Sequence, residues 1–197
     1  ISFKGNNNIS RFQLKENIVS REAWILGFLD RGGVYRKEMV DYDRFQIENF
    51  YHNNGFYEAQ VMNVKLQENE KNGMIDITFF IEEGQIYKFN NISFQNNSNL
   101  SQEKLKRLIR IKNGDKYSKN KIYQVIELIK TELGENGFIQ ATVNPKLKVN
   151  KKDNTIDVEF IIEQGKPVYT RFITISGNTK TYEDIIRREI LFNEGDI

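Results

Sequence analysis

Side chains that could carry acid–base, nucleophilic or metal chemistry are few and far apart in this chain. His52 is the only histidine, and a lone histidine without a partner carboxylate or a second ligand is weak evidence for catalysis or metal binding. Asp76 and Asp157 recur at equivalent places, but they lie in separate halves of the sequence, so they do not form a general acid–base pair. The sequence contains no Gly-rich phosphate loop and no nucleophile elbow. We therefore predict that the protein is not an enzyme and uses no cofactor or metal.

The overall composition excludes several other classes. Cysteine is absent, which rules out thiol catalysis, disulfides and thiolate metal sites. Lys and Arg number 29 against 27 Asp and Glu, and this net charge of +2 does not favour nucleic acid binding, which needs a concentrated basic face. No run of apolar residues is long enough to span a membrane as a helix. With 39% hydrophobic and 28% charged residues, the chain is typical of a globular protein.

Internal repetition is the main signal in the sequence. Three sets of landmarks align: Ile1-Ser2-Phe3 with Ile92-Ser93-Phe94 and Ile173-Thr174-Ile175, Asn54-Gly55-Phe56 with Asn136-Gly137-Phe138, and Ile75–Gly84 with Ile156–Gly165. The last pair has six of ten residues identical. Ile1 and Ile92 are more widely spaced than the other matched landmarks. The first copy therefore carries about nine extra residues, which we place around Trp24 to Gly33.

Each copy has the same expected order of elements. After an opening strand, Ser10 and Ser101 are placed to cap a short first helix. An apolar stripe at helical spacing predicts a second helix in each copy: Val40, Ile47, Phe50 and Tyr51 in the first, and Ile122, Val125, Ile126, Ile129 and Leu133 in the second. Gly55 and Gly137 lie where the second helix ends, a place that favours a left-handed residue.

Two strands close each copy as an antiparallel hairpin. We expect 59–67 to pair with 74–83, and 142–150 to pair with 155–164. The last strand alternates apolar and polar residues and is placed centrally, whereas the strand before it is more polar and contains Pro145 in one copy, so it is placed at an open edge. The third copy has an opening strand from about Val168 to Ile175 and a helix near Tyr182 to Leu191.

The predicted fold is therefore α+β, a tandem array of β-α-α-β-β modules. Each module is expected to be a three-stranded mixed sheet covered on one face by two helices. The predicted domains are residues 1–84, 85–165 and an incomplete module at 166–197. Because the chain does not begin with Met and starts and stops inside modules, we expect it to be part of a longer array.

The open edges are the candidate binding sites. An edge strand can accept an extended partner strand by β-augmentation, through main-chain hydrogen bonds that tolerate many partner sequences. In the first module this strand is Val61, Met62, Asn63, Val64, Lys65 and Leu66. In the second it comprises Thr142, Val143, Asn144, Lys146 and Leu147. The alternative is an ordinary solvated edge, guarded by Lys65 in the first module and by Pro145 and lysines in the second.

An apolar cluster in the extra segment of the first copy has two interpretations. It comprises Trp24, Ile25, Leu26, Phe28 and Leu29. Core packing is the interpretation we prefer, and a partner-facing patch is the alternative.

The motifs around the elements resemble those of POTRA domains. The resemblance rests on a Gly-Asn after the opening strand, a Gly-aromatic after the second helix and a closing acidic-Gly. It is strongest for the BamA family of outer-membrane-protein assembly factors, whose last POTRA domain opens in the manner of Tyr169, Arg171, Ile173, Gly177-Asn178 and Thr179, followed by Arg187-Arg188-Glu189. The three segments are similar to the third, fourth and opening fifth POTRA domains. The second copy departs from the pattern with Asn96-Asn97, which the fold tolerates if Asn takes the left-handed conformation.

This resemblance implies a periplasmic array that feeds a carboxy-terminal membrane barrel outside this chain. The implied partners are unfolded outer-membrane proteins and accessory lipoproteins, with a BamD-like lipoprotein at the last module. Arg187, Arg188 and Glu189 are then candidates for lipoprotein docking, and a solvated helix face is the alternative. A related transporter of the two-partner secretion or TamA type remains open, as does a docking module of the envelope or cell-division machinery.

Overall fold

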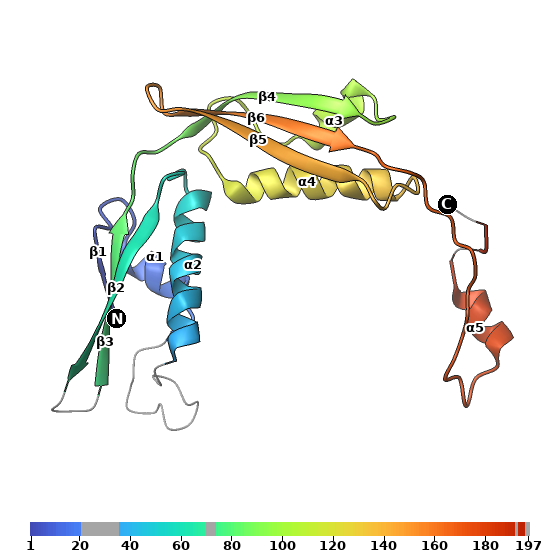
Figure 1. Cartoon of the computed structure of the whole chain (residues 1–197), viewed down its shortest axis with the longest axis horizontal. Coiled ribbons are helices and arrows are strands. Elements are labelled where there is room, and N and C mark those ends of the chain that lie inside the picture. Colours follow the sequence, from blue (N-terminus) through green and yellow to red (C-terminus); the bar gives the residue numbers. More distant parts are fainter. Residues whose placement is uncertain (21–35, 70–73, 192, 196–197) are drawn as a thin grey trace. The chain divides into compact units, whose positions relative to one another are not determined.

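The computed structural model describes residues 1–20, 36–69, 74–191 and 193–195, and Figure 1 traces them from blue to red. The first module contains β1 (Ser2–Lys4), α1 (Arg11–Glu16), α2 (Lys37–Asn53), β2 (Gln60–Asn69) and β3 (Met74–Glu82). The second contains β4 (Lys88–Asn97), α3 (Gln102–Leu108), α4 (Lys119–Gly134), β5 (Thr142–Asn150) and β6 (Thr155–Glu163). A short helix, α5 (Glu183–Glu189), follows.

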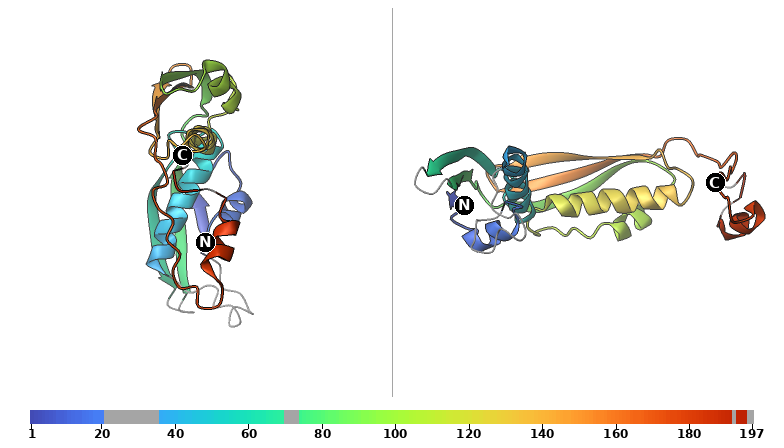
Figure 2. Two further views of the ribbon diagram at one scale, coloured as in Figure 1. Left: turned by 90° about the vertical axis from the view of Figure 1, so that its right-hand side faces the viewer. Right: turned by 90° about the horizontal axis from the view of Figure 1, so that it is seen from below.

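Both modules build a three-stranded sheet with the last strand in the centre. The strand orders are β1-β3-β2 and β4-β6-β5. In the first sheet β3 runs parallel to β1 and antiparallel to β2, so the sheet is mixed. These orders confirm the predicted α+β fold and the placement of β2 and β5 at sheet edges. Figure 2 gives two further views of the helices and sheets.

The chain divides into two compact units. The first comprises residues 1–92, 111–122 and 147–158, and the second comprises 93–110, 123–146 and 159–197. The first unit thus contains the whole described part of the first module together with three segments of the second.

The helix boundaries follow the capping residues that the sequence indicates. Ser10 and Gln13 form a reciprocal capping box at the start of α1, and Ser101 Oγ accepts from the Lys104 amide at the start of α3. Gly55 and Gly137 adopt positive φ angles of 104° and 82° just beyond α2 and α4. The predicted caps are therefore confirmed.

The first core lies between one face of the sheet and the two helices. Phe79 of β3 is fully buried and stacks on Phe3 of β1, with ring centroids 5.7 Å apart. Leu14 of α1 and Ile47 and Tyr51 of α2 are fully buried in the same cluster. Burying these side chains stabilises the module by roughly 1.5–3 kcal/mol each.

The second module repeats this periodicity. Along β6 every second residue is buried, from Ile156 to Ile162. Along α4 the predicted stripe from Ile122 to Leu133 is buried throughout. Both patterns follow from the periods of a strand and a helix, so the sequence predicted them correctly.

Three expectations need correction or cannot be compared with the structure. Residues 168–175 do not form a strand, because the described residues place no neighbouring strand there to pair with their backbone. Asn96 does not take a left-handed conformation; its side chain instead accepts from Ser98 and donates to the Leu100 carbonyl. The apolar cluster around Trp24 lies outside the described residues.

Candidate functional site

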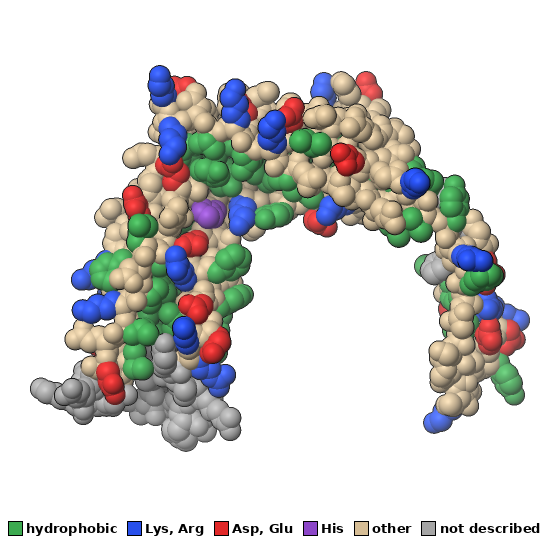
Figure 3. Space-filling model, viewed as in Figure 1, with side chains coloured by type: hydrophobic (Ala, Val, Ile, Leu, Met, Phe, Trp, Pro, Cys, Tyr) green, Lys and Arg blue, Asp and Glu red, His purple; other side chains and the backbone are tan. Residues whose placement is uncertain are grey.

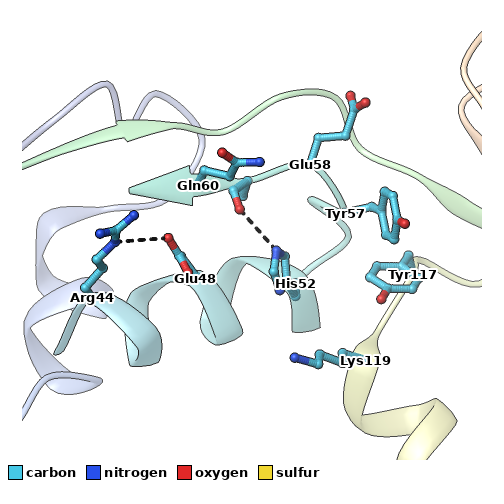
Figure 4. A pocket seen from close by; sticks show the side chains of 9 residues that line it. Arg44, Glu48, His52, Tyr57, Glu58, Gln60, Tyr117 and Lys119 are labelled. Carbon is cyan, nitrogen blue, oxygen red and sulfur yellow. Dashed lines mark hydrogen bonds and ion pairs between the residues drawn. The ribbon is translucent and has the colours of Figure 1, made fainter. Parts of the chain in front are cut away.

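An open cavity of about 650 Å³ lies inside the first compact unit, beside the start of the edge strand β2 (Figure 4). Its lining combines charged, aromatic and amide side chains: Arg44, Glu48, His52, Tyr57, Glu58, Ala59, Gln60, Tyr117 and Lys119. Figure 3 shows the single histidine at the molecular surface, with basic and acidic side chains around it.

A polar stripe on α2 forms one wall of the cavity. Arg44, Glu48 and His52 are spaced four residues apart, so they project from the same side of the helix. Arg44 and Glu48 form an ion pair at 3.5 Å. Glu48 Oε1 accepts a 2.9 Å hydrogen bond from the Val61 amide, and His52 Nε2 lies 3.1 Å from the Ala59 carbonyl oxygen. Helix α2 therefore bonds directly to the main chain at the start of β2.

Burial lowers the pKa of His52 below its ordinary value. The hydrogen bond to Ala59 and the charge of Glu48 oppose this shift, and the charge of Lys119 adds to it. Because a carbonyl oxygen only accepts hydrogen bonds, Nε2 must carry the proton. The lone histidine is thus a hydrogen-bond donor to the Ala59 carbonyl.

The hydrogen bond of Val61 fixes which main-chain groups of β2 point away from the sheet. Opposite residues in an antiparallel pair alternate between bonded and non-bonded pairs. Val61 lies opposite Ile81 and gives its amide to Glu48, so this pair is non-bonded. Consistently, the Ile81 carbonyl points toward Gly5, on the side of β1.

Alternation along β3 then gives the remaining outward residues of β2. Phe79, Ile77 and Ile75 of β3 share the orientation of Ile81, and their partners are Val64, Leu66 and Glu68. These three residues present their amides and carbonyls at the open edge. Asn63 and Lys65 direct theirs toward β3.

A bulge interrupts β2 beside the cavity. The register passes from Val61 opposite Ile81 to Asn63 opposite Phe80, which leaves Met62 without an opposite residue. The Met62 side chain is 61% exposed. The predicted edge 61–66 is therefore two stretches, with Val61 already bonded to α2 and a regular ladder from Asn63 onward.

Aromatic rings form the opposite wall of the cavity. Tyr57 makes edge-to-face contacts with Tyr117 and Tyr87, at centroid distances of 5.3 and 5.7 Å. Beside them Lys151 Nζ lies 2.6 Å from Glu58, and this hydrogen bond holds the pKa of the Glu58 carboxyl below its usual range. The rings give this side of the cavity an apolar surface, and the ion pair of Lys151 with Glu58 lies beside it.

Asn53, the last residue of α2, adds a cap to another helix in this unit. Its Oδ1 accepts from the Asn120 amide at 2.8 Å and from Ser118 Oγ at 3.4 Å, at the start of α4. Unpaired amides at a helix start need such acceptors.

The other predicted site residues have mixed surroundings. In β5, Thr142, Asn144 and Lys146 are exposed, Leu147 is half-buried and Val143 is buried. In α5, Arg187 bonds to Glu183 and to the Ile173 carbonyl.

The remaining charged residues of α5 are solvated. Arg188 and Glu189 are exposed and make no ion pair with any described residue. The part of the chain that the structure describes holds no cluster of three potential metal ligands, and no helix in it is long and apolar enough to cross a membrane.

Sequence reasoning did not identify Glu48 or the partner of His52. The available signal was their four-residue spacing on a helix followed closely by the edge strand. That spacing places both side chains on one side of α2, but only the packing of α2 against β2 brings them to the Val61 amide and the Ala59 carbonyl.

Comparison with known proteins identifies the repeats. The model of the POTRA family, described as a surface antigen variable number repeat, matches residues 1–84 and 87–165. The outer membrane protein assembly factor BamA of Neisseria meningitidis serogroup B is 26% identical over 191 residues, which cover 96% of this chain and 24% of the relative. BamA of Neorickettsia risticii is 28% identical over 198 residues, covering 100% of this chain and 26% of the relative. The chain thus spans about a quarter of the length of these relatives.

Solved structures agree on the fold. The crystal structure of Haemophilus influenzae BamA POTRA3-5 superposes with a TM-score of 0.78 at 24% identity, covering 99% of this chain and 76% of that one. BamA of Haemophilus ducreyi lacking POTRA domains 1-3 superposes with a TM-score of 0.55 at 22% identity, covering 78% of this chain and 30% of that one.

Proposed function

Because this chain belongs to the POTRA family, we propose that it is a periplasmic scaffold of an outer-membrane protein assembly machine, and that it captures unfolded client chains by β-augmentation. The assembly role is taken from relatives that carry the name of outer membrane protein assembly factor. The capture mechanism is taken from the geometry of the first module.

The observation that carries the mechanism is the open outer edge of β2. Among residues 1–20, 36–69, 74–191 and 193–195, nothing pairs with the outward amides and carbonyls of Val64, Leu66 and Glu68, and another extended main chain would complement their spacing. Main-chain recognition suits clients of many sequences. A strand of an outer-membrane barrel alternates apolar and polar side chains. A client strand added to the edge of β2 would likewise place alternate side chains on the two faces of the sheet.

The walls of this edge suit an amphipathic strand. Leu66 of β2 is 44% exposed, and Phe45 of α2 is 53% exposed. Phe45 precedes Glu48 by three residues and is therefore its neighbour on the helix surface. An apolar side chain of a client would find an apolar neighbour on either wall.

The second edge is the weaker candidate. Pro145 has no amide to donate, and Lys146 and Lys148 add charge beside it. We therefore assign client capture to β2 rather than to β5, and we propose that β5 stays solvated.

We further propose that an accessory lipoprotein docks on α5 through Arg188 and Glu189. Both side chains are exposed. Arg187, in contrast, already forms hydrogen bonds within its own segment, to Glu183 and to the Ile173 carbonyl. Charge reversal at Arg188 is then expected to weaken lipoprotein capture, and Arg187 substitutions are expected to act by loosening the segment.

A crosslinking scan tests the capture mechanism. A photoreactive residue is placed in turn at positions 61–66, and at 142–147 as the matched control, and a nascent outer-membrane barrel protein is supplied. Crosslinks concentrated on β2 support the proposal. Crosslinks elsewhere on the chain with none along β2 contradict it.

A further inference from the structure

The start of β2 is already bonded by α2, so the open edge has a definite end. The Val61 amide is held by Glu48 at 2.9 Å, and the Ala59 carbonyl is held by His52 at 3.1 Å. Both contacts occupy groups that a client strand would otherwise use. In the described part of the chain, no side chain comparably bonds the outward groups of Val64, Leu66 or Glu68.

We infer that Glu48 and His52, which we call the stop pair, set the register of a bound client by ending its pairing before Val61. The client is an extended polypeptide with alternating apolar and polar side chains, and it pairs with Val64, Leu66 and Glu68. This inference rests on the proposed function and adds the position at which client pairing ends. Glu48 and His52 act as positioning residues.

Two features make the stop pair hard to displace. Arg44 forms an ion pair with Glu48 at 3.5 Å, and this contact helps to orient the carboxylate. The Met62 bulge lies between the bonded start of β2 and the regular ladder, and a bulge bends the strand that carries it. A client that crossed the bulge would have to replace two hydrogen bonds and follow a kinked backbone.

The second module supplies a natural contrast. In the alignment that matches Ala59 with Ala141, the counterparts of Glu48 and His52 are Lys130 and Gly134. Neither can hold a backbone amide or carbonyl as the stop pair does, since Lys only donates and Gly has no side chain.

The first outward amide is missing from the second edge as well. Beyond the bulge the alignment shifts by one position and matches Ile75 with Ile156, so the counterpart of Val64 is Pro145. Proline has no amide to offer a partner strand. The second edge thus lacks both the stop pair and the group with which client pairing would begin.

Amide hydrogen exchange, resolved residue by residue by NMR on the 197-residue chain, tests the inference. The probe is a synthetic peptide of alternating valine and threonine, blocked at both ends. In the unaltered chain the peptide is expected to slow exchange at Val64, Leu66 and Glu68 by about tenfold, the factor that corresponds to 1.4 kcal/mol. Exchange at Val61 stays unchanged.

Substitution of Glu48 tests whether this side chain sets the end of client pairing, independently of whether the client pairs with β2 at all. In Glu48→Ala the peptide is expected to extend its protection to Val61, because the amide is released. Glu48→Gln keeps an acceptor oxygen and is expected to keep the original limit. Glu38→Ala, an exposed position on the same helix, is the control and leaves the pattern unchanged.

The outcomes distinguish the two proposals. Protection that reaches Val61 in the unaltered chain overturns the stop pair and leaves β-augmentation intact. The same conclusion follows if Glu48→Ala, with its fold verified by an unchanged spectrum elsewhere, leaves the limit at Val64. No protection anywhere along β2 overturns the capture mechanism itself and the stop pair with it.

Discussion

The phenol of Tyr51 donates a 2.9 Å hydrogen bond to Oε1 of Glu83, and both side chains are buried. The same carboxylate accepts from the Asn8 amide at 3.0 Å, from the Asn8 side chain at 2.6 Å and from the Ile9 amide at 3.4 Å. Glu83 therefore ties α2 to the loop after β1. In the first repeat, the acidic residue of the closing acidic-Gly motif, Glu83, thus has a structural role, and we call its hydrogen bonds to Tyr51, Asn8 and Ile9 the Glu83 clasp.

The second module uses a different pair at these positions. Leu133 replaces Tyr51 and Gln164 replaces Glu83. Leu133 is fully buried and has no donor, and the Gln164 side chain accepts from the Asn99 amide at 2.7 Å. The buried phenol donor and the carboxylate thus occur together in the first module, and both are replaced in the second. We expect them to be replaced together, because a buried carboxylate without hydrogen-bond donors destabilises the fold.

Glu83→Ala is expected to destabilise the chain by about 3 kcal/mol or more, because the buried Tyr51 hydroxyl and the Asn8 and Ile9 amides lose their acceptor. Thermal or urea unfolding measures the loss. Glu82→Ala, an exposed neighbour, is the control and should change stability by less than about 0.5 kcal/mol. Equal losses of stability in the two variants would show that the Glu83 clasp does not contribute more to stability than an exposed side chain.

Gly5→Ala is expected to cost about 3 kcal/mol. Gly5 has a φ of 89°, and an added Cβ would overlap the Ile81 carbonyl oxygen, so backbone strain and a backbone clash both act. Gly114→Ala is the matched control, since its φ is 86° and nothing lies within 4 Å of the added Cβ. Only strain of about 1 kcal/mol is expected there. Chemical denaturation of both variants compares them, and the clash is refuted if Gly114→Ala costs as much.

His52 is expected to make the stability of the chain depend on mildly acidic pH. Its pKa is lowered in the folded state, chiefly by burial, so the unfolded chain binds the proton more readily. Stability is therefore complete above the ordinary value of 6.5 and falls as the pH drops below it.

Urea unfolding between pH 7 and pH 5 measures this dependence, and His52→Gln should flatten it. Because His52 is the only histidine, little else titrates in this window. Carboxyls such as Glu58, whose pKa is lowered by Lys151, lose their contribution only at more acidic pH. A profile that keeps its slope in His52→Gln would contradict the assignment.

Val64→Pro is expected to abolish pairing of a client peptide with β2 while costing the fold only about 1 kcal/mol. The Val64 amide points outward, so proline removes no bond of the sheet, and the second module carries Pro145 at this position. Lys65→Pro is the contrasting variant, since its amide faces β3 and its loss should cost about 3 kcal/mol. Denaturation and peptide titration measure the two effects. Greater destabilisation by Val64→Pro would show that the outward residues are wrongly assigned.

Several features of the fold could be predicted from the sequence because they depend on local periodicity. The stripe from Ile122 to Leu133 predicted α4, the alternation from Ile156 predicted β6, and Gly55 and Gly137 marked helix ends. Pro145 alone predicted that β5 lies at a sheet edge, because proline cannot donate to a ladder. The opening strand predicted at 168–175 was wrong, since the described residues place no neighbouring strand beside it.

The sequence by itself determined the module and its spacing, and the tertiary structure decided what the spacing means. The offset between the two copies is larger by one before β2 than after it, as the pairs Ala59 with Ala141 and Ile75 with Ile156 show. The position that accounts for this difference is the bulged Met62, which only the pairing of β2 with β3 could reveal. The outward direction of Val64 and the bonding of Val61 by Glu48 likewise depend on contacts between distant segments. Side-chain periodicity is a local property of the backbone, whereas strand register and helix-to-edge bonds arise only when separate elements pack together.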